Sequence, residues 1–229
     1  CCRIGSCRGS VRMKRYDLVV FDWDGTLVDS AAHIVSSLQA ASRDIGFEAP
    51  SDEASRHIIG LGLQDALDYL FPSITRADSG RLVDRYRHHY LGGESVVVLF
   101  DGVDAGLRAL QARGHFLAVA TGKSRVGLER ALDDTQLRSR FDATRCGDEG
   151  FSKPHPGMLE YLLDRLCVEP ARALMVGDTT HDLEMAAGAR VDAVAVTYGA
   201  HEPAKLAKAP STVTVDTPQE LWAWLTANA

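Results

Sequence analysis

One short apolar run that ends abruptly in acidic residues constrains the fold of this chain more than any other feature. Leu18–Phe21 contains no polar residue and leads directly into Asp22-Trp23-Asp24-Gly25-Thr26. A run of this kind predicts a strand that is buried on both faces, as in a parallel sheet. Because open α/β sheets bind ligands outside the carboxyl ends of their strands, the acidic residues are predicted to lie at a ligand site.

Asp22 and Asp24 are two positions apart, and side chains with this spacing point the same way on extended chain. The sequence therefore predicts two carboxylates side by side, which would repel and raise each other's pKa unless a cation neutralised them. Oxygen ligands suit a hard divalent ion, which favours magnesium. A strand followed by an ordinary turn is the alternative, because Asp-Gly is a common turn dipeptide.

The rest of the chain alternates between predicted strands and helices. Further strands are predicted at Phe116–Ala120, Phe141–Thr144, Ala173–Val176, Val191–Val196 and Val213–Val215. Core helices are predicted at Val103–Arg113, from about Val126, at Gly157–Cys167, from Asp182 to Ala189, near Pro203 and at Pro218–Ala227. This alternation predicts an α/β core with a parallel sheet and right-handed crossovers.

Residues 29–99 are predicted to be almost entirely helical. Asp29 or Ser30 is predicted to cap a helix that runs to about Gly46, and further helices are predicted around Arg56–Ile59, at Leu63–Phe71 and at about Ser79–Leu91. A doubly wound sheet would return to a second strand after one helix, so this stretch predicts an inserted, smaller all-helical domain. The alternative is that these helices extend the core. The run Val96–Leu99 has the composition of a strand, although its position suits a hinge between two domains.

These patterns divide the chain into a core of residues 13–28 and 100–229, a helical domain of 29–99 and an extension of 1–12. The extension is basic and lacks the apolar segment of a secretory signal, so we expect it to be disordered. The five cysteines form no paired framework, which favours a reducing, cytoplasmic location. A net charge of -6 argues against nucleic acid as a partner, and no apolar stretch is long enough to predict a membrane span.

Three later stretches also place polar residues at predicted strand or helix ends. They are Thr121-Gly122-Lys123-Ser124, Ser152-Lys153-Pro154-His155-Pro156, and Gly177-Asp178 with Asp182 four residues further on. Together with the first stretch they resemble, in the same order, the four motifs of the haloacid dehalogenase-like hydrolases. Most members of that family are magnesium-dependent phosphatases with a Rossmann-like core, and a helical cap domain is inserted where residues 29–99 lie.

The resemblance implies phosphoryl transfer through an aspartyl-phosphate. Asp22 would attack phosphorus, and Asp24 would give a proton to the leaving alkoxide and later take one from water. Mg²⁺ would be held by Asp22, by the backbone carbonyl of Asp24 and by Asp178. Because the dehalogenases and phosphonoacetaldehyde hydrolases of the family lack an acid at the position of Asp24, this residue favours phosphate monoesters.

The resemblance also implies which groups bind the phosphoryl oxygens. Thr121, the backbone at Gly122, and Lys153 would hold them, and Asp182 would orient Lys153 or a metal-bound water. The family usually has Asn where Gly122 stands, and this change keeps the backbone donor but loses a side chain. The alternatives are structural, because a threonine can cap a helix and an aspartate suits the first turn of one.

Several neighbouring polar residues are predicted to lie outside the site. Lys123 and Arg125 are interpreted as solvated cations at a helix end, with a contribution to the positive potential of the site as the alternative. His155 is interpreted as an exposed turn residue. Gly60-Leu61-Gly62 is a candidate loop of the cap that faces the core, although it also suits a simple helix connection.

The stretch Asp22–Ser30 is most similar to phosphoglycolate phosphatases, so the expected partner is a small phosphorylated metabolite. A phosphomutase of the same fold, a phosphorylatable signalling domain and an inactive binding module are the alternatives. The complete set of acid, threonine and lysine argues against the last. The sequence does not specify the phosphate ester or the oligomeric state.

Overall fold

The computed structural model describes residues 14–92 and 98–229 of the chain. The expected extension of residues 1–12 lies outside the described residues, and so do Val96 and Val97 of the strand-like run Val96–Leu99. Leu99 itself forms only an isolated bridge with Val28. No helix in the described part of the chain is both long and apolar enough to cross a bilayer.

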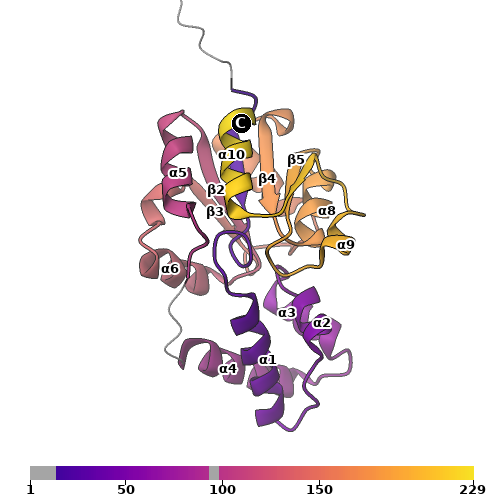
Figure 1. The fold of residues 1–229 in the computed structure, drawn as a ribbon. Coiled ribbons are helices and arrows are strands. Elements are labelled where there is room, and N and C mark those ends of the chain that lie inside the picture. The colour runs from indigo at the N-terminus through magenta and orange to yellow at the C-terminus, as the bar shows by residue number, and fades with distance from the viewer. Residues whose placement is uncertain (1–13, 93–97) are drawn as a thin grey trace, which may run out of the picture.

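The centre of the molecule is a parallel sheet in the order β3-β2-β1-β4-β5-β6, formed by the described residues (Figure 1). Its strands are β1 (Leu18–Phe21), β2 (Phe116–Thr121), β3 (Ala143–Cys146), β4 (Ala173–Gly177), β5 (Asp192–Val196) and β6 (Val213–Val215). The run that opened the sequence analysis is the central strand, and it pairs with β2 on one side and β4 on the other. The strand order reverses at β1, which is where such sheets bind ligands.

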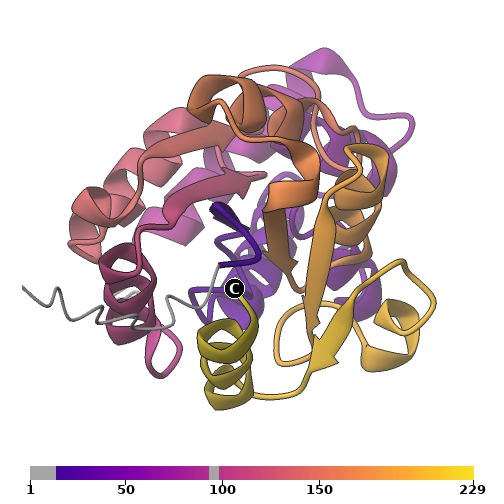
Figure 2. The same cartoon turned by 90° about the horizontal axis from the view of Figure 1, so that it is seen from above.

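Helices cover both faces of this sheet, as the view from above shows (Figure 2). The described helices are α1 (Ala31–Asp44), α2 (Asp52–His57), α3 (Leu63–Leu70), α4 (Arg76–Gly92), α5 (Val103–Ala112), α6 (Arg125–Asp134), α7 (Gly157–Leu166), α8 (Thr180–Gly188), α9 (Pro203–Leu206) and α10 (Pro218–Asn228). Val19 and Phe21 pack with α5, α6 and α10, whereas Leu18 and Val20 pack with α7 and α8. The central strand is apolar on every residue because both of its faces are covered.

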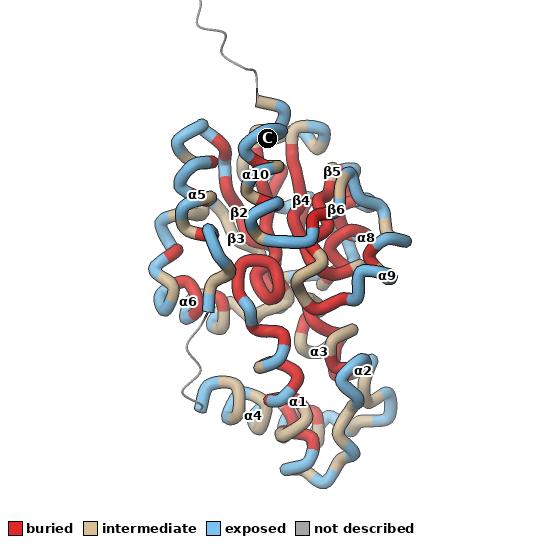
Figure 3. The backbone as a smooth tube through the Cα atoms, in the orientation of Figure 1, coloured by how far each residue is buried: buried red, intermediate tan, exposed pale blue. Residues whose placement is uncertain are grey.

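Helices α1 to α4 form the inserted cap domain, which lies at one end of the core (Figure 1). Leu38, Ile58, Leu67 and Leu82 make a separate hydrophobic cluster inside it, and α1 packs along α4. Figure 3 shows the central strands β1 and β4 buried along their length, whereas much of α2 and α4 is exposed. The fold is therefore the predicted α/β core with a helical cap.

Several element ends differ from those predicted, for local reasons. Helix α2 begins at Asp52 because the side chain of Ser51 accepts a hydrogen bond from the backbone N–H of Ala54. Strand β3 was predicted at Phe141–Thr144 and lies at Ala143–Cys146, because its pairing with β2 matches Thr121 with Cys146. Such pairing is a long-range property that a single run of residues does not show.

Candidate active site

The carboxyl ends of β2, β1 and β4 bring three predicted site residues to one edge of the sheet. Thr121 is the last residue of β2, while Asp22 and Asp178 directly follow β1 and β4. All three are buried, with exposed fractions of 1% for Thr121 and 0% for both aspartates. They are neighbours because these strands are parallel and adjacent in the sheet.

Lys153 lies between two of the buried carboxylates. Its Nζ is 2.6 Å from Oδ1 of Asp22 and 2.6 Å from Oδ1 of Asp182, and none of the three side chains is exposed. Burial opposes protonation of Lys153, but Asp182 and Asp22 outweigh it and raise the lysine pKa. Burial is also the main reason why the pKa of Asp22 lies well above its usual value. Lys153, Asp22 and Asp182 together place charged groups in the dry interior, where burying a charge is costly unless it has a close partner of opposite charge.

Asp178 is held by two hydrogen bonds on the other side of this group. The hydroxyl of Thr26 donates to Oδ1 and the backbone N–H of Ala200 donates to Oδ2, each at 2.7 Å. Burial, followed by the nearby charge of Asp182, raises the pKa of Asp178 to about 7. Gly25 adopts a φ of 87°, and a Cβ there would lie 2.2 Å from Oδ2 of Asp178. Only glycine therefore fits between the first motif and the fourth.

The three carboxylates fit a hard divalent cation. Each of Asp22, Asp178 and Asp182 offers an oxygen, and these atoms lie within 4.8 Å of one another. Oδ2 of Asp22 is buried and has no hydrogen-bond partner, and the pKa values of Asp22 and Asp178 are both raised. A cation would lower the cost of keeping these groups ionised. An all-oxygen donor set of this kind suits Mg²⁺.

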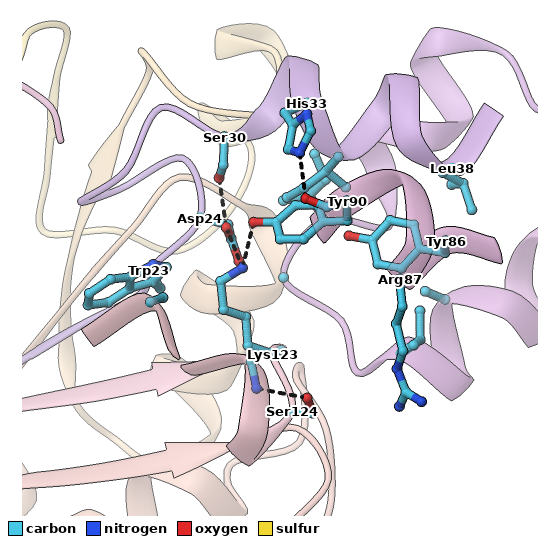
Figure 4. A pocket seen from close by; sticks show the side chains of 18 of the residues that line it. Trp23, Asp24, Ser30, His33, Leu38, Tyr86, Arg87, Tyr90, Lys123 and Ser124 are labelled. Carbon is cyan, nitrogen blue, oxygen red and sulfur yellow. Dashed lines mark hydrogen bonds and ion pairs between the residues drawn. The ribbon is translucent and has the colours of Figure 1, made fainter. Parts of the chain in front are cut away.

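The carboxylate of Asp24 is not part of that group. Its Oδ1 accepts a hydrogen bond from the hydroxyl of Ser30 at 2.7 Å and lies 3.0 Å from Nζ of Lys123 (Figure 4). The alternation expected along extended chain ends at β1, because the chain turns at Trp23 and Gly25. The carboxylate of Asp24 therefore lies outside the group of three acidic residues, which differs from the side-by-side arrangement that the strand spacing predicts. The backbone carbonyl of Asp24 stays a predicted metal ligand.

Lys123 corrects a sequence prediction, because it is not a solvated helix-end cation. Its side chain is only 12% exposed. Besides Asp24, it contacts Tyr90 of the cap: Nζ donates to the tyrosine hydroxyl at 2.9 Å and lies 4.8 Å from the ring centroid (Figure 4). Burial acts to lower the pKa of Lys123, but the opposing effects of Asp24 and Tyr90 are larger together, so the pKa is raised overall. Lys123 thus links cap and core beside Asp24.

Arg125 is also tied down rather than freely solvated. Its guanidinium donates to Glu149 and Glu129 and to the hydroxyl of Thr144. These bonds join the start of α6 to β3, which is a structural role. His155 is exposed, as predicted, and its ring accepts only from the nearby backbone of Gly157.

The cap loop at Gly60-Leu61-Gly62 faces the core, which the sequence left as one of two options. A Cβ on Gly122 would lie 2.2 Å from the carbonyl oxygen of Leu61. The backbone N–H of Gly62 donates to Ser152 at 2.6 Å. Glycine stands where the family usually has asparagine because the backbone of the cap loop occupies the space of a side chain.

Sequence reasoning missed Ser30, Lys123 as a partner of Asp24, and Tyr90. Ser30 was interpreted only as a helix cap, yet its side chain makes no cap hydrogen bond and donates to Asp24 instead. Its place six residues after Asp24 was the one available signal. Nothing in the sequence indicates that Tyr90, on the last turns of α4, faces the core.

Comparison with known proteins agrees with this geometry. The family described as haloacid dehalogenase-like hydrolase matches residues 19–196, and the chain therefore belongs to that family. It is 37% identical over 210 residues to "Probable phosphatase IndB" of Dickeya dadantii, covering 89% of this chain and 91% of that protein. It is 32% identical over 190 residues to "Phosphoglycolate phosphatase" of Agrobacterium fabrum, covering 80% and 81%.

A solved structure gives the same result for the fold. The crystal structure of a predicted phosphoglycolate phosphatase from Haemophilus somnus matches with a TM-score of 0.81 and 26% identity, covering 94% of this chain and 98% of that one. The predicted family and enzyme class, a hydrolase similar to phosphoglycolate phosphatases, are thus confirmed.

Proposed function

We propose that this hydrolase is a magnesium-dependent phosphatase that cleaves a small phosphate monoester, similar to phosphoglycolate, through a phosphorylated Asp22. The observation that carries the proposal is the buried Lys153 between Asp22 and Asp182, with Asp178 beside them. The relatives of this chain include proteins named as phosphatases. An arrangement this costly to bury is typical of a functional site.

In the first half of the reaction, a carboxylate oxygen of Asp22 forms a bond to phosphorus as the bond to the leaving oxygen breaks. Lys153 donates to Asp22, and this positive charge favours the ionised, nucleophilic carboxylate. Asp22, Asp178 and the backbone carbonyl of Asp24 would hold Mg²⁺, which would supply positive charge to offset the repulsion between these carboxylates and the phosphoryl group. Asp182 keeps Lys153 in place from the opposite side.

Asp24 is proposed to act as the acid in the first half of the reaction and as the base in the second half. It gives a proton to the departing alkoxide, and then removes one from the water that attacks phosphorus, so that Asp22 and inorganic phosphate are released. Ser30 and Lys123 fix its carboxylate beside the cap. Thr121, the backbone N–H of Gly122, and Lys153 hold the remaining phosphoryl oxygens during transfer.

The test is release of inorganic phosphate from a panel of phosphate monoesters, including phosphoglycolate, nucleotides and sugar phosphates. The protein is first treated with a chelator, and each ester is assayed with and without added Mg²⁺. We expect release that depends on Mg²⁺. A folded protein that releases phosphate from none of these esters would overturn the proposal, and an isomerised sugar phosphate without release would identify a mutase.

A further inference from the structure

A cavity at the junction of cap and core begins beside Asp24. Its volume is about 570 Å³, and Asp24 and Lys123 border it on the core side (Figure 4). This size falls within the range of roughly 300–1,000 Å³ that is typical of pockets for drug-sized ligands. Because Asp24 is the proposed proton donor to the leaving group, the part of a substrate beyond its phosphate would lie in this space.

The cap side of the cavity is strongly apolar. Its aliphatic lining includes Leu63 and Leu70, which are partly exposed, and Ile34, Leu38, Ile58 and Leu67, which are already buried. Two tyrosines of α4, Tyr86 and Tyr90, add aromatic surface, and their rings stack with centroids 5.5 Å apart. Figure 4 shows Leu38 and both tyrosines around the same space. A surface of this composition gains most from an apolar partner that removes it from water.

The polar groups of the cavity do not suit the carboxylate of a glycolate. The cation Lys123 borders the cavity, but its ammonium group is already bound to Asp24 and Tyr90. Arg87 and Arg130 also border the cavity, but both are exposed residues. A carboxylate placed among the cap leucines would lose water without gaining an ionic partner, which is costly. A two-carbon group would also leave most of the apolar lining uncovered.

We infer that the preferred substrate is a phosphate monoester of a bulky, apolar, ring-containing alcohol, whose ring lies against Tyr86 and the cap leucines. The inference rests on the proposed phosphatase activity, but it names an apolar, ring-containing ester as the preferred substrate in place of one similar to phosphoglycolate. Aromatic rings prefer offset stacking or edge-to-face contact, and Tyr86 already stacks on Tyr90, so a planar ring would extend the pair.

The test compares primary alcohol esters of similar intrinsic reactivity, since phenol esters would react faster for chemical reasons alone. The kcat/KM values of ethyl, benzyl and 1-naphthylmethyl phosphate are measured with Mg²⁺, together with that of 2-phosphoglycolate. We expect kcat/KM to rise at least about tenfold from the ethyl to the naphthylmethyl ester, since each added apolar group in a fitting pocket gives a factor of this order. The naphthylmethyl ester should also exceed 2-phosphoglycolate.

Two tyrosine variants locate the effect. Tyr86→Leu should lower the ratio of kcat/KM for naphthylmethyl over ethyl phosphate about tenfold. Tyr69→Leu is the matched control, because Tyr69 is 55% exposed on α3 and does not border the cavity. It should leave the ratio unchanged. Where Tyr86→Leu does not fold, Ala66→Leu narrows the same cavity and should lower the same ratio.

The outcomes separate the inference from the proposed function. Faster hydrolysis of 2-phosphoglycolate than of any apolar ester would overturn the inference and leave the phosphatase intact. Equal ratios in Tyr86→Leu, Ala66→Leu and the parent protein would likewise overturn it. Failure of all the esters with folded protein would remove the proposed function, and the inference with it.

Discussion

The described part of the chain holds two groups of three possible metal ligands, and they differ in what surrounds them. One consists of Asp22, Asp178 and Asp182, and the other of three histidines, His57, His181 and His201. In each group the candidate ligand atoms lie within 4.8 Å of one another. By distance alone the two groups are equivalent.

Two of the three histidine rings, those of His181 and His201, are held by hydrogen bonds. Nε2 of His181 and Nε2 of His201 lie 2.7 and 3.0 Å from the carbonyl oxygen of His57, to which they can only donate. The backbone N–H of Thr180 donates to Nδ1 of His201 at 3.1 Å. These bonds attach α2 of the cap to α8 and to the loop between β5 and α9 of the core. The histidines therefore serve as a joint between the domains.

The acidic group is not satisfied in this way. Its carboxylates carry like charge in the dry interior, and one oxygen of Asp22 has no partner. The comparison teaches that closeness of ligand atoms is a weak sign of a metal site, whereas uncompensated charge in a buried place is a strong one. Four experiments, in order of expected size, test this difference.

Asp22→Asn should have the largest effect and should act on turnover. Loss of a nucleophile lowers kcat by on the order of 10⁴-fold or more. The amide keeps the shape of the side chain, and Lys153 retains Asp182 as a partner, so the fold should persist. Phosphate release and thermal unfolding measure the two properties. Substantial remaining turnover in the purified variant would show that Asp22 is not the nucleophile.

Asp182→Asn should lower stability, because the amide loses the buried ion pair with Lys153 and is a weaker acceptor for the backbone N–H and the hydroxyl of Thr179, bonds that Asp22 does not make. Breaking a buried ion pair costs roughly 3–5 kcal/mol. The matched control is Asp78→Asn, which removes a surface pair with Arg81 and should cost less than about 1 kcal/mol. Urea unfolding gives both values. Equal costs would show that the buried lysine is not an energetic feature of the site.

The two groups should respond to pH with opposite sign. Burial lowers the pKa of His201 from 6.5 to about 4, so the unfolded chain binds more protons below pH 6.5. Stability should therefore fall as the pH drops from 6.5 to 4, by at most about 3 kcal/mol. The pKa of Asp178 is raised from 3.8 to about 7, so the stability that its protonated form contributes in metal-free protein is instead lost as the pH rises from 3.8 to about 7.

This difference is measured by urea unfolding of chelated protein at several pH values. His201→Asn should reduce the loss of stability on the acid side. It should not change the opposing trend, the loss of stability as the pH rises toward 7, which Mg²⁺ should remove. If the free energy of unfolding falls equally in the variant and the parent between pH 6.5 and 4, burial does not keep His201 neutral.

The smallest expected effect is stabilisation by Mg²⁺. An ion at 100 times its Kd adds about 2.7 kcal/mol to the free energy of unfolding. Asp178→Asn should abolish the rise in melting temperature, whereas His181→Asn should keep it, even if its starting stability is lower. If instead the histidine variant loses the response, the metal binds at the domain joint, and the comparison fails.

Much of the site was predictable because parallel strands align their carboxyl ends. The apolar runs of β1, β2 and β4 are readable locally, and adjacency in a parallel sheet then brings Asp22, Thr121 and Asp178 together without further information. The helical cap was likewise visible as a stretch in which no strand follows the first helix.

The direction of side chains beyond the strand ends was not predictable. Asp24 was expected beside Asp22, yet the turn at Gly25 directs it to Ser30 and Lys123. Such a turn depends on the close approach of Gly25 to Asp178, a residue far away in sequence. The sequence shows that glycine is present, and the packing shows why.

By itself the sequence determined the fold class, the order of the elements and the set of charged residues at the strand ends, since these follow from local apolar patterns. The tertiary structure decided which charges pair, how the cap loop fills the space at Gly122, and that Tyr90 meets Lys123. These contacts join segments that are distant along the chain, and their geometry is set by the packing of one domain on the other.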